Sequence, residues 1–144
     1  MDIAYWINAP VSADQFIDLL RRCSLGERRP TEDRACMQGM VANSNLMVSA
    51  WDGDRLVGIA RALTDFHYAC YLSELAVDEH YQRRGIGKRL QALTQEQLGP
   101  RCHLIVIAAP AAADYYAQLG GYEHNPRCWV LARERRIGDR QGTD

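Results

Sequence analysis

Apolar and polar positions in the first 45 residues form one short strand pattern followed by two helical patterns. Alternating apolar residues at positions 3–7 predict a strand. Ser12 and Gln15 then fit a capping box, and apolar residues from Phe16 to Cys23 recur at helical spacing. A second helix is predicted over 31–43, because Thr-Glu-Asp at its start supplies a cap and an acidic first turn.

Strand patterns dominate the middle of the chain. The apolar runs at 46–51 and 56–63 flank Asp52-Gly53-Asp54, a turn sequence that favours a β-hairpin. Period-two alternation places the odd-numbered residues of 46–51 on one face of the sheet and the even-numbered residues on the other. A further strand is predicted at about 69–77.

The second half alternates between helix and strand. A helix is predicted at 87–98, a strand buried on both faces at 103–108, a short helix at 111–119 and a last strand region from Tyr122, clearest at 129–131. This order predicts an α/β fold: a single domain over residues 1–132 with a mixed, mostly antiparallel central sheet and helices on both faces. Residues 133–144 are predicted to be a polar C-terminal tail.

Composition excludes several classes of partner. The 144 residues are 47% hydrophobic and 24% charged with a formal net charge of -1, which gives no reason to expect nucleic acid or an acidic membrane as partner. The longest uncharged apolar run is too short to span a bilayer, and the N-terminus lacks a signal-peptide pattern. We therefore expect a cytoplasmic protein. Its cysteines and histidines lack metal-ligand spacing, so no metal is expected.

A glycine-containing stretch, Gln-Arg-Arg-Gly-Ile-Gly-Lys at 82–88, carries the strongest chemical signal. It follows the predicted strand at 69–77 and leads into a helix. Two glycines allow a tight turn with uncovered N–H groups, and the helix N-terminus adds partial positive charge. Such a loop can bind a phosphate or pyrophosphate. It matches neither the dinucleotide fingerprint nor the P-loop, so by itself it is also consistent with a simple turn.

Two segments together resemble the GNAT superfamily of acyltransferases. Residues 75–88, Leu-Ala-Val-Asp-Glu-His-Tyr-Gln-Arg-Arg-Gly-Ile-Gly-Lys, resemble its acyl-CoA-binding motif, Q/R-x-x-G-x-G/A. Residues 113–120, Ala-Asp-Tyr-Tyr-Ala-Gln-Leu-Gly, are similar to its A-x-x-F-Y-x-x-L-G-F segment. The resemblance covers residues 45–132 and implies a GNAT-like fold with acetyl-CoA as co-substrate.

The resemblance also implies which residues hold the co-substrate. The backbone of one strand would pair with the amide-rich pantetheine arm, which would lie along it like an added half-strand, and loop amides would bind the pyrophosphate. The strand residues are Leu75, Ala76 and Val77, and the loop residues are Gln82, Arg83, Arg84, Gly85, Ile86, Gly87 and Lys88.

The implied reaction is transfer of an acetyl group to a primary amine, on a small molecule or a protein. Tyr116 stands where the family motif has its tyrosine and is the candidate general acid for the leaving thiolate; Tyr115 is its competitor, read as a core aromatic. Glu74 is the candidate general base, or else an edge carboxylate or one that binds a cationic substrate. Strict alternation places Glu74 and Tyr71 on opposite faces of their strand, which a β-bulge would change.

Two departures from the family pattern concern the cleft. Pro110-Ala111-Ala112 lacks an asparagine that many members carry there, and Leu119-Gly120-Gly121-Tyr122 replaces Leu-Gly-Phe. The alternative to an enzyme is a CoA-binding sensing module without turnover, although the retained Tyr116 favours the enzyme. The sequence leaves the acceptor open, and leaves the oligomeric state open with a homodimer as one option.

Overall fold

A five-stranded mixed sheet forms the centre of the protein in the computed structural model, which describes residues 2–133. Its spatial order follows the chain, from β1 to β5. The first four strands pair antiparallel, and the last two pair parallel. The mixed, mostly antiparallel sheet predicted from the sequence is therefore confirmed. The strands are β1 (Ala4–Ile7), β2 (Leu46–Asp52), β3 (Arg55–Thr64), β4 (Ala69–Val77) and β5 (His103–Val106).

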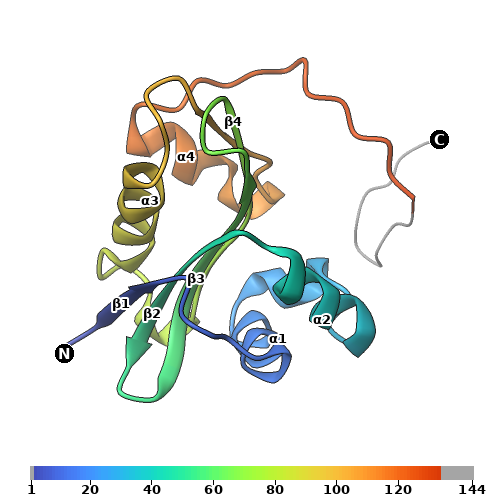
Figure 1. Ribbon diagram of the computed structural model, residues 1–144, viewed down its shortest axis with the longest axis vertical. Helices are drawn as coiled ribbons and strands as arrows, with labels where there is room; N and C mark the ends of the chain where they lie inside the picture. Colours follow the sequence, from blue (N-terminus) through green and yellow to red (C-terminus); the bar gives the residue numbers. More distant parts are fainter. Residues whose placement is uncertain (1, 134–144) are drawn as a thin grey trace.

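Helices cover both faces of this sheet. The first two helices lie together on one side and the third on the other, with the fourth between the third helix and β4 in the view of Figure 1. Three 3₁₀ turns connect the elements. The helices are α1 (Ala13–Arg21), α2 (Arg34–Asn43), α3 (Ile86–Glu96) and α4 (Ala113–Leu119), and the turns are η1 (Ser24–Arg28), η2 (Glu79–Tyr81) and η3 (Pro110–Ala112).

Local signals set the starts of the first two helices. The predicted capping box of α1 is confirmed: the Gln15 amide donates to the Ser12 hydroxyl at 3.0 Å, and the Ser12 amide donates to Gln15 Oε1 at 2.9 Å. The second helix starts later than predicted. Its N-cap is Asp33, whose carboxylate accepts from the Cys36 amide at 3.1 Å, so the preceding Thr31 lies outside the helix.

Each face of the sheet has its own apolar core. The predicted alternation in β2 is confirmed, because Val48 packs in the core beneath α3 while Met47 packs in the core beneath α1. Phe16, Leu19 and Leu20 of α1 are fully buried, and burying such side chains contributes about 1.5–3 kcal/mol each.

A β-bulge in β4 changes which side chains share a face. Glu74 pairs with Arg61 of β3, but Leu72 pairs with the very next residue of β3, so Ser73 is the extra residue. Before the bulge Leu72 packs beneath α3; after it, Ala76 packs beneath α1. Glu74 therefore faces the α1 side together with Tyr71. The strict alternation expected from the sequence is wrong here, and the bulge is the physical reason.

The predicted last strand is not formed. Residues 120–133 contain no helix or strand, and the chain leaves α4 through two glycines with φ of 77° and 84°. Trp129 and Leu131 are 91% and 87% exposed. Figure 1 shows this segment running across the top of the molecule and away from the sheet. As a consequence β5, predicted to be buried on both faces, leaves Ile105 46% exposed.

The predicted tail, the search for membrane-spanning helices and the cysteines complete the comparison with the sequence. The predicted polar tail lies, except for its first residue, outside the described residues. Within 2–133, no helix is long and apolar enough to cross a membrane. All five cysteines are free thiols.

The turn between β3 and β4 depends on Asp65. Its carboxylate accepts from the amides of His67, Tyr68 and Ala69 at 3.0, 2.8 and 3.0 Å, and the Tyr68 amide comes first among the causes that lower the pKa of Asp65 to about 2. The same turn holds the start of β5, since the His103 amide donates to the Tyr68 carbonyl at 2.9 Å.

Asp65→Ala should lower the melting temperature at pH 7, because three amides lose their acceptor. The pKa of Asp65 is depressed in the folded protein, so its contribution is present above the unfolded pKa of about 4 and is lost as pH falls toward 2. The gap between the two proteins in thermal or denaturant unfolding should therefore shrink from pH 5 to pH 3. Glu123→Ala, which removes an exposed carboxylate, is the control; a gap that does not change with pH would contradict this role.

Candidate active site

A large cleft opens where β4 and β5 stop pairing. Their last paired residues are Leu72 and Val106, and beyond them β4 continues to Val77 while pairing with β3. The cleft has a volume of about 1080 Å³. Its walls come from β4, the 82–88 loop, the start of α4 and the segment around η1. The candidate residues of β4, of the 82–88 loop and of α4 thus line the same cavity.

The 82–88 loop leads into α3, and its last three residues form the first turn of that helix. Gly85 is the N-cap with φ of 84°, a left-handed conformation that favours glycine, and no side chain caps the helix. First-turn amides such as those of Ile86 and Lys88 have no carbonyl partner within the helix, and the helix dipole adds positive charge. These residues therefore fit a pyrophosphate group.

Gly87 has a different reason to be glycine. A Cβ at this position would lie 3.2 Å from the Tyr115 hydroxyl oxygen and 3.7 Å from Val77 Cγ2. The missing side chain lets α4 approach α3 closely. The absence of a side chain at Gly87 thus lets α4 lie close to the 82–88 loop.

A network of ion pairs fixes the segment between β4 and the 82–88 loop. Asp78, fully buried directly after β4, is ion-paired with Arg22 at the C-cap of α1 and accepts from the His80 amide at 2.8 Å. Burial alone would raise the pKa of Asp78, but the His80 N–H and the Arg22 guanidinium hold it below its usual value. Arg22 also donates to the Leu56 carbonyl at 2.8 Å.

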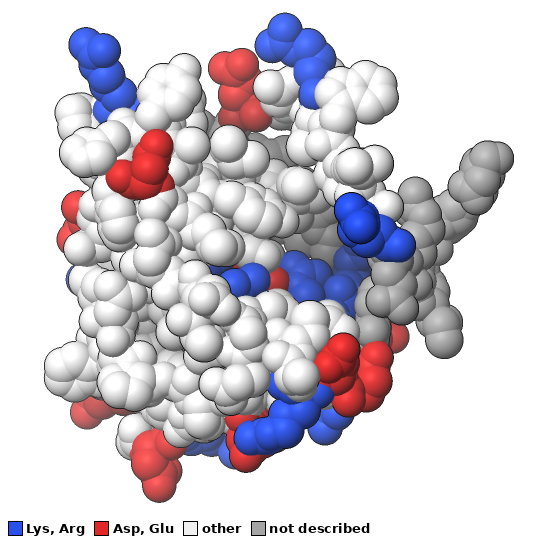
Figure 2. Space-filling model, turned by 45° about the vertical axis from the view of Figure 1, so that its right-hand side comes forward, with Lys and Arg blue, Asp and Glu red and all other residues white. Residues whose placement is uncertain are grey.

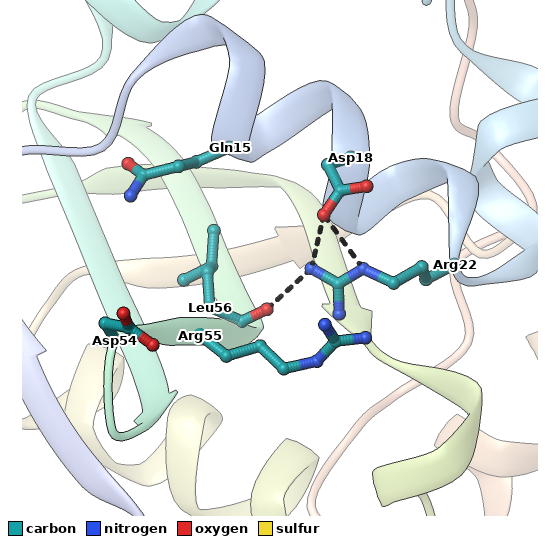
Figure 3. A pocket seen from close by; sticks show the side chains of 6 residues that line it. All are labelled: Gln15, Asp18, Arg22, Asp54, Arg55 and Leu56. Carbon is teal, nitrogen blue, oxygen red and sulfur yellow. Dashed lines mark hydrogen bonds and ion pairs between the residues drawn. The ribbon is translucent and has the colours of Figure 1, made fainter.

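Figure 3 shows this anchor from the side of a smaller cavity of about 270 Å³, with Arg22 bound to Asp18 and to Leu56. The Arg22–Asp18 distance is 3.1 Å. Both arginines of this cavity are already paired, Arg22 with Asp18 and Asp78 and Arg55 with Asp78. These ion pairs fix the end of α1 to the end of β4, next to the 82–88 loop.

Tyr116 of α4, the candidate general acid, lines the large cleft. Its ring packs edge-to-face between Tyr115 and Tyr122, with centroid distances of 5.2 and 5.3 Å. Burial, with a contribution from the neighbouring Tyr122 and Tyr115, raises the pKa of Tyr116 to about 12. The phenol therefore keeps its proton at neutral pH. Within residues 2–133 its hydroxyl has no hydrogen-bond partner, which leaves that proton available to a ligand.

The neighbouring tyrosine differs in that its hydroxyl is already bound. Gln91 of α3, almost fully buried, donates to the Tyr115 hydroxyl at 3.1 Å and to the Gly87 carbonyl at 3.2 Å. The Tyr122 hydroxyl donates to Gln91 Oε1 at 2.5 Å. Sequence reasoning missed Gln91; a polar side chain next to Leu90 on the apolar face of α3 was the available signal.

Glu74 is buried in the cleft wall between two arginines. Its Oε2 accepts from Arg29 Nε at 2.6 Å and from the Ser73 hydroxyl at 2.9 Å, while Oε1 accepts from Arg61 Nε. Arg61 is itself buried, and donates to the Met40 carbonyl at 3.1 Å. Both oxygens of the carboxylate are thus occupied.

Neither arginine was predicted from the sequence. A charged residue in the middle of the apolar run at 56–63 was a signal for Arg61, but nothing local marks Arg29, which lies 45 positions before its partner. Figure 2 shows a hollow on this face with Lys or Arg side chains inside it. The same part of the cleft also has apolar and sulfur-containing walls, formed by Cys23, Leu25, Pro30, Cys36, Met40 and Tyr71.

Comparison with known proteins identifies the family. Residues 27–129 match the family model described as the acetyltransferase (GNAT) domain. The chain belongs to the GNAT acetyltransferase family, a family of acyltransferase enzymes, and the predicted membership is confirmed.

A curated relative is the chloroplastic GCN5-related N-acetyltransferase 2 of Arabidopsis thaliana, 32% identical over 77 residues. That match covers 50% of this chain but 28% of the relative, so the two are comparable over one part of a longer protein.

Solved structures agree on the fold. A probable acetyltransferase from methicillin-resistant Staphylococcus aureus has a TM-score of 0.71 at 17% identity, covering 92% of this chain and 99% of that one. The aminoglycoside N-acetyltransferase AAC(6')-Iy, solved in complex with CoA, has a TM-score of 0.67 at 18% identity, covering 93% and 95%. No group of three or more His, Cys, Asp or Glu within residues 2–133 could hold a metal ion.

Gly85→Ala should destabilise the protein by about 1–2 kcal/mol, because a side chain is strained at this positive φ although the space around it is open. Gly39→Ala is the matched control. Gly39 lies inside α2, also with open space, so alanine there should stabilise by about 0.5–1 kcal/mol. Denaturant unfolding measures both changes, and equal effects at the two sites would contradict the strain argument.

Proposed function

We propose that the protein is an N-acetyltransferase that moves an acetyl group from acetyl-CoA to a primary amine. The observation that carries this proposal is that a protonated phenol, Tyr116, lines the same cleft as the uncapped first turn of α3. Bound acetyl-CoA would supply the activated acetyl thioester. A neighbour of similar fold has been solved with CoA, which supports the choice of co-substrate.

Two segments would hold the co-substrate. The free edge of β4 supports pairing with the amide-rich pantetheine arm, at Leu75, Ala76 and Val77. Gln82 ties the loop to this edge, since its side chain donates to the Val77 carbonyl at 3.0 Å. The pyrophosphate would lie on the amides of the loop, Gln82, Arg83, Arg84, Gly85, Ile86, Gly87 and Lys88.

The reaction needs one proton removed and one supplied. The acceptor must lose a proton before its nitrogen can attack the acetyl carbon, and the departing sulfur must receive a proton or a hydrogen bond. In our proposal, Tyr116 donates its hydroxyl proton to that sulfur. A raised pKa makes it a weaker acid but guarantees that it is protonated when the bond to sulfur breaks.

Tyr116→Phe should lower kcat by about 10²–10⁴-fold while changing the Kd for acetyl-CoA less than threefold, since it removes a proton donor and keeps the ring. Thiol release and titration calorimetry measure the two quantities. Tyr115→Phe is the control: it loses the hydroxyl bound to Gln91 and should change kcat less than tenfold. An unchanged kcat in Tyr116→Phe would mean that another group protonates the sulfur.

The general-base role of Glu74 stays a prediction. Its two oxygens accept from Arg29, Arg61 and Ser73, so taking a proton would mean exchanging at least one of these bonds. The geometry supports an alternative in which Glu74 positions the two guanidinium groups and the acceptor loses its proton to water.

Glu74→Gln separates these two roles. We expect the KM for the acceptor to rise and kcat to stay within tenfold, because the arginines lose their anchor while the chemistry continues. A fall in kcat of a hundredfold or more, together with loss of the acidic limb of the pH profile, would instead assign the base to Glu74. Thermal unfolding of the variant checks that the fold is intact.

Other functions have less support. A CoA-binding sensing module would not need a phenol at Tyr116, so the enzyme is favoured. The acceptor, a small molecule or a protein amine, is not defined by family membership. A cytoplasmic location, the lack of nucleic-acid and membrane partners, and a homodimer stay predictions.

A further inference from the structure

We propose that the acceptor amine carries a carboxylate and that Arg29 binds it, so that the substrates are amino acids or similar small amino carboxylates. This inference rests on the proposed function and adds the class of acceptor. It starts from the balance of charge in the cleft wall. Among the residues described, Glu74 is the one carboxylate that lines the cleft, while Arg29 and Arg61 both contact it.

The three side chains together carry one surplus positive charge. Arg61 is almost fully buried, and it donates to Ser44 at 2.9 Å and to Ser73 at 3.1 Å in addition to Glu74. The surplus therefore belongs to the more accessible guanidinium, Arg29, whose side chain is 20% exposed. Because Arg29 shares its one anion, Glu74, with Arg61, the pair of arginines can take a second carboxylate.

Arg29 also has hydrogen-bond donors to spare. Of its five N–H groups, one goes to Glu74, one to the Arg28 carbonyl at 3.1 Å and one to the Ser73 carbonyl at 2.8 Å. Each terminal nitrogen thus keeps one N–H without a partner among residues 2–133. A carboxylate is the ligand that a guanidinium with spare N–H donors suits best.

Arg29 lies at a distance from the proposed acetyl site that fits the short separation between the carboxylate and the amine of an amino acid. It binds the carbonyl of Ser73, two residues before Leu75, where the strand edge proposed for pantetheine begins. Two residues of strand span roughly 7 Å. A carboxylate on Arg29 and an amine near the acetyl group are thus separated by only a few bonds. The neighbouring Leu25, Pro30 and Met40 would accept an apolar side chain.

The same wall disfavours polycations. Some structural neighbours are aminoglycoside acetyltransferases, one of them solved with sisomicin. An aminoglycoside would bring several ammonium groups against a wall with surplus positive charge. The chain shares the fold of these enzymes, but its cleft favours an acceptor of the opposite charge.

Matched pairs of acceptors test the inference. Phenylalanine with phenylalaninamide, and methionine with methioninamide, are compared by thiol release at saturating acetyl-CoA, beside an aminoglycoside. Values of kcat/KM are corrected for the fraction of unprotonated amine, because the amides lose their proton more readily. We expect the carboxylates to exceed the amides at least tenfold, and the aminoglycoside to be the poorest acceptor.

Arg29→Gln should abolish this preference while leaving the Kd for acetyl-CoA unchanged, and it leaves Glu74 paired with Arg61. Arg21→Gln removes an exposed arginine that does not line the cleft and should keep the preference. Three results would overturn the carboxylate site but not the proposed function. These are equal rates for acids and amides, a preference for the aminoglycoside, or a preference for acids that remains in Arg29→Gln. No thiol release with any amine would overturn the proposed function itself.

Discussion

The bulge at Ser73 is the constraint on which the rest of the site depends. It turns the second half of β4, so that Glu74 faces α1 and α2 rather than α3. At the same point the parallel pairing with β5 ends after Leu72, and the strand edge that follows becomes free. One extra residue thus creates a cleft between two strands and places a carboxylate in its wall.

Two sets of ion pairs then hold the two ends of this half-strand. At one end, Glu74 is braced by two arginines; at the other, Asp78 is braced by Arg22. Burying charges stabilises a protein little by itself, since desolvation offsets much of the attraction, but it fixes geometry, because breaking one partner leaves an unpaired charge. We infer that these pairs define where the strand ends and the phosphate loop begins, while the apolar cores supply most of the stability.

Features set by neighbouring residues were predictable from the sequence. The capping box at Ser12, the Asp52-Gly53-Asp54 hairpin and the loop around Gly85 each depend on contacts within a few positions. Features set by distant contacts were not. Arg29 contacts its partner Glu74, which lies 45 positions away. The residues around Trp129 favour a strand, but a strand forms only where a neighbouring strand is present to pair with it, and Trp129 is exposed. Tyr116 was identified through family resemblance; its raised pKa follows first from burial in the folded protein and then from the neighbouring Tyr122 and Tyr115, and the burial is not visible in the adjacent sequence.

The central claim is that the first turn of α3 binds the pyrophosphate of acetyl-CoA. Titration calorimetry of the wild-type protein with acetyl-CoA and with S-acetylpantetheine, which lacks the nucleotide and pyrophosphate, tests it most directly. We predict one acetyl-CoA per chain and at least hundredfold weaker binding of the truncated compound, because the helix N-terminus loses its anion. Equal affinity for the two compounds, or no binding of acetyl-CoA at millimolar concentration, would contradict the claim.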